Sequence, residues 1–118
     1  MAKDKLFLLS PHFIDPKAGF SRFYCPECAF VEGIIAYHPA LRDLLEIQQL
    51  AFPRPRPVLI DLLGPDLQSC PVLVLAETSR TPFKIVEVSP TTGRRYVAGF
   101  KTIAEFLAAA YGIDHAHP

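Results

Sequence analysis

The sequence predicts one α/β domain spanning residues 1–118, in which helices flank a mixed four-stranded sheet. Apolar runs of strand length alternate with segments of helical periodicity, in the order β-α-β-α-β-β-α. This order favours parallel pairing in the first half of the chain and antiparallel pairing in the second. A chain of 118 residues is also long enough to bury roughly two-thirds of its unfolded surface in a single core.

A long loop separates the first strand from the first helix. Residues 5–9 form an apolar run that a Ser-Pro pair ends, which is typical of a strand buried on both faces. Residues 10–23 follow with two prolines and a glycine, and loops of this length are often functional or mobile. Over residues 26–37, apolar side chains recur at three- and four-residue steps before a proline closes the segment, which predicts a helix.

The middle of the chain predicts a second strand between two short helices. Residues 40–45 fit a short helix, and residues 46–52 fit a strand that Pro53 stops. The Pro-Arg-Pro-Arg-Pro segment that follows forces an extended turn. Its last proline, Pro57, suits the first turn of a helix over residues 57–63, which a Gly-Pro pair ends.

The second half of the chain is richer in β-branched residues. The runs 71–76 and 83–88 are separated by a polar stretch and predict an antiparallel pair of strands. Residues 94–97 fit a further short strand. A Thr-x-x-Glu capping box beginning at Thr102 predicts the start of an alanine-rich helix, which Gly112 ends.

Charge and composition exclude several classes of function. Lys plus Arg and Asp plus Glu number 12 each, so no net field attracts nucleic acid or an anionic membrane. No apolar run is long enough to span a bilayer, and the first residues lack the apolar segment and cleavage site of a signal peptide. We therefore expect a cytoplasmic protein, monomeric or weakly dimeric, with no nucleic-acid or membrane partner.

A Cys-Pro-Glu-Cys segment at residues 25–28 carries the main chemical signal. If the helix begins at Pro26, Cys25 is its N-cap, where unpaired N–H groups and the helix dipole stabilise a thiolate. Cys28 lies one turn further on the same face, so it can attack a mixed disulfide formed at Cys25. Glu27 opposes the thiolate through its own negative charge. Cys25 is therefore the expected nucleophile of thiol–disulfide exchange, and Cys28 is the expected resolving cysteine.

These features resemble the thioredoxin and glutaredoxin superfamily. The resemblance rests on Phe-Tyr-Cys-Pro-Glu-Cys at 23–28 after a first strand, on the order of the elements, and on Ser-Cys-Pro-Val at 69–72 before the third strand. A narrower similarity, which includes Phe-Pro-Arg-Pro-Arg at 52–56, is to an uncharacterised bacterial family of small thioredoxin-like proteins. The resemblance implies a thioredoxin-like fold and a substrate that is a protein or small-molecule disulfide or thiol.

The resemblance also implies roles for individual residues. Pro71 matches the superfamily's cis-proline, so we expect the Cys70–Pro71 bond to be cis and the backbone before it to pair with a substrate. Residues 98–102 fall where glutaredoxins hold the carboxylate of glutathione, which makes glutathione a candidate co-substrate, while no cofactor is required. Independently of the resemblance, Arg54 and Arg56, set between prolines, are candidates to hold a carboxylate or phosphate. Taken together, the expected substrate-binding residues are Tyr24, Pro26, Arg54, Arg56, Cys70, Pro71, Lys101 and Thr102.

Two other interpretations of these residues stay open. Cys25, Cys28 and Cys70 offer three thiolates, and His12 a fourth ligand, for a tetrahedral zinc site. Alternatively, the thiols are inert and the Pro-Arg-Pro-Arg-Pro segment binds a partner. For Cys70 we expect neither a disulfide nor a metal bond in the resting protein, but a neutral thiol beside the pair. The polar tail around His115 is expected to be frayed.

Overall fold

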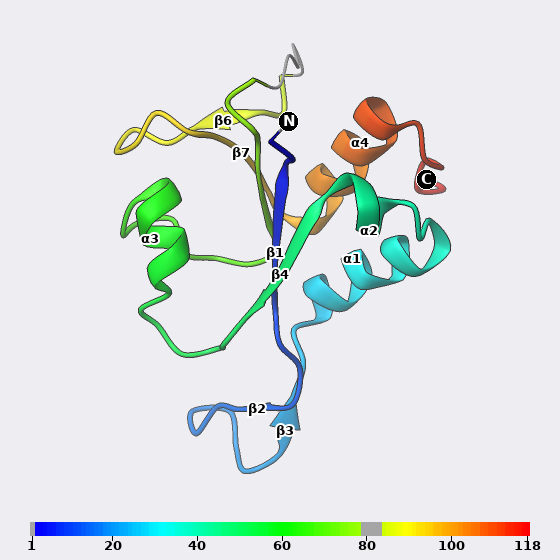
Figure 1. Cartoon of the computed structure of the whole chain (residues 1–118). Helices are drawn as coiled ribbons and strands as arrows, with labels where there is room; N and C mark the ends of the chain where they lie inside the picture. Colours follow the sequence, from blue (N-terminus) through cyan, green and yellow to red (C-terminus); the bar gives the residue numbers. More distant parts are fainter. Residues whose placement is uncertain (1, 79–83) are drawn as a thin grey trace.

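The computed structural model describes residues 2–78 and 84–118, and its main sheet lies between helices (Figure 1). In chain order the elements are β1 (Lys5–Leu9), β2 (Phe13–Ile14), β3 (Arg22–Phe23), α1 (Pro26–Tyr37), α2 (Leu41–Leu44), β4 (Glu46–Leu50), α3 (Pro57–Leu63), β5 (Val72–Val74), β6 (Glu87–Val88), β7 (Arg95–Ala98) and α4 (Phe100–Tyr111). Within the described part of the chain, no helix combines the length and the apolar character needed to cross a membrane.

The main sheet has five strands in the order β4-β1-β5-β7-β6. Strand β1 pairs parallel with β4 and antiparallel with β5, while β7 pairs antiparallel with both β5 and β6. The α/β class is therefore confirmed, as is a mixed sheet that is parallel in the first half of the chain and antiparallel in the second.

Helices cover both faces of this sheet. Side chains alternate along β1, so that Leu6 and Leu8 are buried with residues of α1 and α4, whereas Phe7 is buried with Leu59 of α3. Figure 1 shows α3 on one side of the central strands, with α1, α2 and α4 on the other. This two-sided cover explains why the β1 sequence is a continuous apolar run rather than an alternating one.

The predicted antiparallel pairing of the runs 71–76 and 83–88 is wrong, because β7 lies between β5 and β6. A tight turn joins β6 to β7: the Ser89 N–H donates to the Arg94 carbonyl at 2.8 Å, and Gly93 adopts a φ of 74°. This hairpin puts β6 at the edge. The sheet has five strands rather than the predicted four, because the further short strand expected at 94–97 joins it as β7. Phe83, at the start of the second run, lies outside the described residues.

The long loop before α1 has its own small sheet. Strands β2 and β3 are two residues each and pair antiparallel, with Phe13 opposite Phe23. In Figure 1 this hairpin extends from the end of the molecule at which β1 ends and α1 begins. The loop is therefore an ordered feature next to the cysteine pair.

Helix α4 begins earlier than the predicted capping box indicates. Its N-cap is Gly99, with a φ of 89° and no side-chain cap, so Thr102 lies inside the first turn and the capping-box prediction is wrong. Because glycine tolerates positive φ, the chain turns from β7 into the helix within one residue. The predicted C-terminal end is confirmed, since Gly112 caps α4 in the left-handed conformation with a φ of 70°.

Candidate functional site

Cys25 is the N-cap of α1, as predicted from the proline that follows it. Its backbone is extended, and Pro26 occupies the first turn, where a missing N–H costs nothing. The Cys25 Sγ accepts the N–H of Cys28 at 3.4 Å. The half-buried sulfur thus faces the free N–H groups at the helix start, which is the electrostatic setting that favours an anion.

Cys28 is the most enclosed of the three thiols, with 2% of its surface exposed. Its Sγ accepts the N–H of Leu9, the last residue of β1, at 3.4 Å. Burial raises the pKa of Cys28 from 9.0 to about 12; the Leu9 hydrogen bond opposes this rise, whereas the hydrogen bond and charge of Cys25 and the charge of Cys70 add to it. Cys28 is therefore protonated at neutral pH, and it forms no disulfide with Cys25.

Cys70 lies at the same end of the sheet. The β1–β5 register pairs Phe7 with Val72, and its continuation places Cys70 opposite Leu9, whose N–H contacts Cys28. Cys70 is half-buried and packs against the clusters on both faces of the sheet. Burial raises the pKa of Cys70 to about 11, although the nearby arginines lower it. The Cys70–Pro71 bond is cis, as predicted.

The two arginines of the Pro-Arg-Pro-Arg-Pro segment have different environments. Arg56 is 6% exposed, and its guanidinium donates to the carbonyls of Gln68, at 2.7 Å, and Phe52. Its backbone N–H also donates to the Gln68 side chain at 2.7 Å. Arg56 thus ties the start of α3 to the loop that leads into Cys70. Arg54 is exposed and donates to Ser69 at 3.3 Å, so it is the arginine that a ligand can reach.

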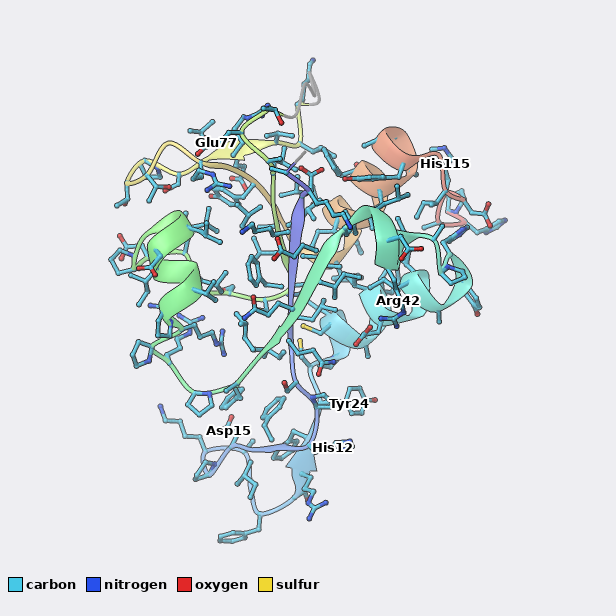
Figure 2. All side chains as sticks on the ribbon, in the orientation of Figure 1. His12, Asp15, Tyr24, Arg42, Glu77 and His115 are labelled. Atoms are coloured by element: carbon cyan, nitrogen blue, oxygen red, sulfur yellow. The ribbon has the colours of Figure 1, made fainter. Side chains whose placement is uncertain are left out.

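A hollow of about 430 Å³ opens beside the cysteine pair. Its lining consists of Leu9, Pro11, His12, Tyr24, Cys25, Cys28, Ala29 and Glu32. His12 has a positive φ of 65°, and Tyr24 is 64% exposed; Figure 2 shows the two side chains next to each other where β1 leads into the loop. The structure therefore brings the predicted residues His12 and Tyr24 to the thiols.

Several residues at this site were not predicted from the sequence. The Phe13 ring stacks on the Phe52 ring at a centroid distance of 4.2 Å, which fixes the β2–β3 hairpin to the segment that contains the arginines. Glu32 lies seven residues after Cys25, two helical turns further along α1, and this spacing was the available signal for its place in the hollow. The contact between Phe13 and Phe52 has no local signal.

Lys101 and Thr102 lie in the first turn of α4. The Lys101 ammonium sits over the Phe100 ring at 5.8 Å, and Phe100 in turn packs edge-on against Phe30 of α1 at 4.9 Å. No interaction recorded for the described residues joins Lys101 or Thr102 to a cysteine. Their predicted role in substrate binding stays a prediction.

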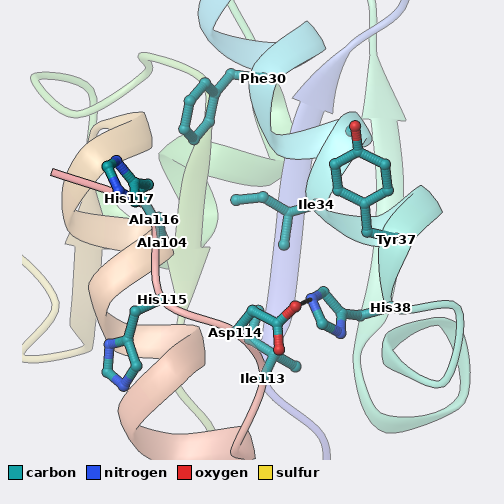
Figure 3. A pocket seen from close by; sticks show the side chains of 11 residues that line it. Phe30, Ile34, Tyr37, His38, Ala104, Ile113, Asp114, His115, Ala116 and His117 are labelled. Atoms are coloured by element: carbon teal, nitrogen blue, oxygen red, sulfur yellow. Dashed lines mark ion pairs between the residues drawn. The ribbon is translucent and has the colours of Figure 1, made fainter.

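The C-terminal tail, predicted to be frayed, folds back along α1 and α4. The core contact of Ile113 and an ion pair between Asp114 and His38 at 3.6 Å hold it there. Figure 3 shows this tail across a second hollow of about 410 Å³, with His115 and His117 at its edge. Neither this hollow nor the cysteine site gathers three or more His, Cys, Asp or Glu side chains in a metal-binding arrangement, among the residues described.

Comparison with known proteins gives one family match. A family model described as a protein of unknown function covers residues 3–115. Neither the curated proteins nor the solved structures gave a significant match.

Proposed function

The chain belongs to DUF3088, a family of unknown function, and from the chemistry of its cysteine site we propose that it is a thiol–disulfide oxidoreductase with a thioredoxin-like fold. Cys25 is the nucleophile and Cys28 the resolving cysteine. The observation that carries the proposal is the Cys25 sulfur at the N-terminus of α1, accepting the Cys28 N–H at 3.4 Å at the mouth of a hollow. The helix-flanked mixed sheet, parallel and then antiparallel, supports the proposed fold.

The first step is attack by the Cys25 thiolate on one sulfur of a substrate disulfide. A bond forms between Cys25 and that sulfur, the substrate S–S bond breaks, and the other half leaves as a thiolate that takes a proton from water. Free N–H groups at the start of α1 stabilise the attacking anion. Half-burial leaves one side of Cys25 open to the hollow, so a small disulfide can reach it.

The second step needs Cys28 to lose its proton. Burial is the largest cause of its raised pKa and does not change, but the charge and hydrogen bond of Cys25 also raise it. Once Cys25 is part of a mixed disulfide, its negative charge is gone, so this contribution falls and Cys28 ionises more readily. Cys28 then attacks the Cys25 sulfur, releases the bound half as a thiolate and closes the Cys25–Cys28 disulfide, having passed two electrons to the substrate.

The arginines and Cys70 complete the electrostatics of this site. Arg56 is buried among carbonyls, and its positive charge lowers the pKa of Cys70. It acts as a structural cation that holds the Cys70 loop. We assign Arg54, which is exposed, to a carboxylate of the substrate. Cys70 remains a neutral thiol while the other two cysteines exchange.

An insulin-reduction assay with dithiothreitol as the electron source tests the proposal. The wild-type protein should accelerate precipitation of the insulin B chain, Cys25→Ser should fall to the uncatalysed rate, and Cys28→Ser should be strongly slowed. A Cys25→Ser protein as active as the wild type would contradict the proposal. Zinc measured in the same preparations distinguishes the metal-binding alternative: stoichiometric zinc that disappears in Cys70→Ser would overturn the redox assignment.

A further inference from the structure

We propose that the hollow beside Cys25 binds the non-reacting part of a small disulfide that carries a cationic amine, with Glu32 as the selecting carboxylate. This inference deepens the proposed function and rests on it, because it names the class of substrate that Cys25 attacks. The hollow lies between Cys25 and the 10–23 loop, and its lining does not include the Cys70–Pro71 segment, which the superfamily resemblance assigns to substrate binding.

The hollow is built from one stripe of α1 and one stretch of loop. The residues that α1 contributes are spaced at three- and four-residue steps, so they lie along a single face of the helix; they are Cys25, Cys28, Ala29 and Glu32. The end of β1 and the start of the loop form the facing wall, with His12 among its residues. A volume of about 430 Å³ falls within the range of small-molecule pockets.

Glu32 gives this hollow a negative charge in addition to that of the reacting Cys25 thiolate. It is the only carboxylate among the described lining residues, and that lining contains no lysine or arginine. The carboxylate accepts a hydrogen bond from the Gln49 amide at 3.1 Å, which positions it without neutralising it, and no ion pair to Glu32 occurs among the described residues. Arg54, the exposed cation of the site, contacts Ser69 and is not part of this lining.

The spacing along α1 sets the size of the ligand. Glu32 lies seven positions after Cys25, which is about 10 Å along the helix axis. Side chains tilt toward the helix N-terminus, and because the Glu32 side chain is longer than that of Cys25, this tilt brings its carboxylate closer to the sulfur. An ammonium group two carbons from the attacked disulfide, as in cystamine, therefore lies between the two. The apolar lining, which includes Leu9 and Ala29, suits the carbon chain.

Charged methanethiosulfonates test the hollow without any need for turnover. The Cys25 thiolate attacks the sulfenyl sulfur, forms a disulfide and expels methanesulfinate, so the reaction needs no other reactant. The aminoethyl reagent is cationic and the sulfonatoethyl reagent anionic. Their rate ratio is measured at Cys25 in a Cys28→Ser/Cys70→Ser background, in which Cys28 cannot release the adduct. The thiolate fraction cancels in this ratio, and division by the ratio for 2-mercaptoethanol cancels the difference in the intrinsic reactivity of the two reagents. At low ionic strength this normalised ratio should exceed unity by about five- to tenfold.

Two variants on the same helix decide the origin of that ratio. Glu32→Gln should bring the ratio to within about twofold of unity, whereas Glu27→Gln, which removes the same charge from an exposed residue outside the hollow, should leave most of it. A wild-type ratio within twofold of unity would overturn the proposal. So would a Glu27→Gln effect as large as that of Glu32→Gln, because the preference would then come from a general field.

Turnover separates failure of this inference from failure of the proposed function. With cystamine and the neutral bis(2-hydroxyethyl) disulfide, kcat/KM should favour cystamine by about three- to fivefold, and Glu32→Gln should remove the preference. Equal turnover of both disulfides contradicts the inference alone and leaves the oxidoreductase assignment standing. Turnover of neither disulfide contradicts the proposed function, while the methanethiosulfonate ratio still tests the charge of the hollow.

Discussion

Alkylation with iodoacetamide should separate the three thiols in the order Cys25, Cys70, Cys28. Only thiolates react, so the rate of each cysteine follows its ionised fraction and its exposure. For Cys28 the pKa rises from 9.0 to about 12. Because each pH unit is a factor of ten, its thiolate at pH 8 is about 1,000-fold scarcer than in an ordinary thiol. For Cys70, with a pKa of about 11, the corresponding factor is about 100.

Burial adds to the protection of Cys28. With 2% of its surface exposed, even its rare thiolate meets the reagent only when the start of α1 opens. The rate should rise about tenfold per pH unit between pH 7 and 9.5, because the whole range lies below its pKa. A free thiol such as 2-mercaptoethanol, included as the reference, should begin to level off near pH 9.

Peptide mapping after timed quenching measures these rates. Trypsin leaves Cys25 and Cys28 on one peptide, 23–42, so fragment ions between the two residues must assign the label, whereas Cys70 lies on a separate peptide. A Cys28 rate within tenfold of the reference thiol would refute the reasoning from burial. Labelling of Cys28 before Cys25 would also reverse the proposed roles of nucleophile and resolving cysteine.

Three further outcomes follow from the contacts around the site. Cys70→Ser should keep most of the insulin-reductase activity, because a neutral, half-buried thiol takes no part in the exchange; loss of more than about 90% in a folded variant would contradict this. Arg56→Met should lower the free energy of unfolding by about 2–4 kcal/mol in a urea titration, since two carbonyls lose a charged donor, while the exposed Arg54→Met control should change it by less than about 0.5 kcal/mol. The Tyr111 hydroxyl donates to Asp4 at 2.6 Å, and burial, followed by this hydrogen bond, raises the pKa of Tyr111. Above about pH 10 this tyrosine therefore ionises in the unfolded chain but not in the folded one, which should reduce the free energy of unfolding. Tyr111→Phe should weaken that decline in urea titrations at about pH 9 to 11.

The helices and the first strands could be predicted because prolines and glycines mark where these elements begin and end. Pro26 and Pro57 each begin a helix because their fixed φ and missing N–H suit its first turn. Gly112 ends the last helix because it adopts a left-handed conformation without steric cost. Such local effects act within a few residues, so the sequence reports them directly.

Pairing between distant strands was not predictable in the same way. The runs 71–76 and 83–88 both fit strands, but the turn at Ser89 decides that β6 pairs with β7 rather than with β5. The two-residue strands β2 and β3 are too short to show an alternating pattern. Their place is set instead by the stacking of Phe13 on Phe52, two residues 39 positions apart.

The site was predictable where chemistry depends on local position. The Cys-Pro-Glu-Cys segment placed Cys25 at the N-terminus of a helix, and the structure confirms that placement. The burial of Arg56 was not predictable, because a charged residue between prolines is normally solvated, and its carbonyl partners at Gln68 and Phe52 come from separate segments. The hollow that includes Glu32 likewise exists only once the 10–23 loop packs against α1.

Trapping of the mixed disulfide tests the central claim most directly. Reduced Cys28→Ser, treated with bis(2-hydroxyethyl) disulfide, should gain one 2-mercaptoethanol group, located at Cys25 by peptide mapping, because the resolving thiol that would release it is absent. Wild-type protein under the same conditions should carry no lasting adduct and should form the Cys25–Cys28 disulfide. An adduct at Cys70 in place of Cys25, or a wild-type protein that accumulates the adduct without closing the pair, would contradict the account.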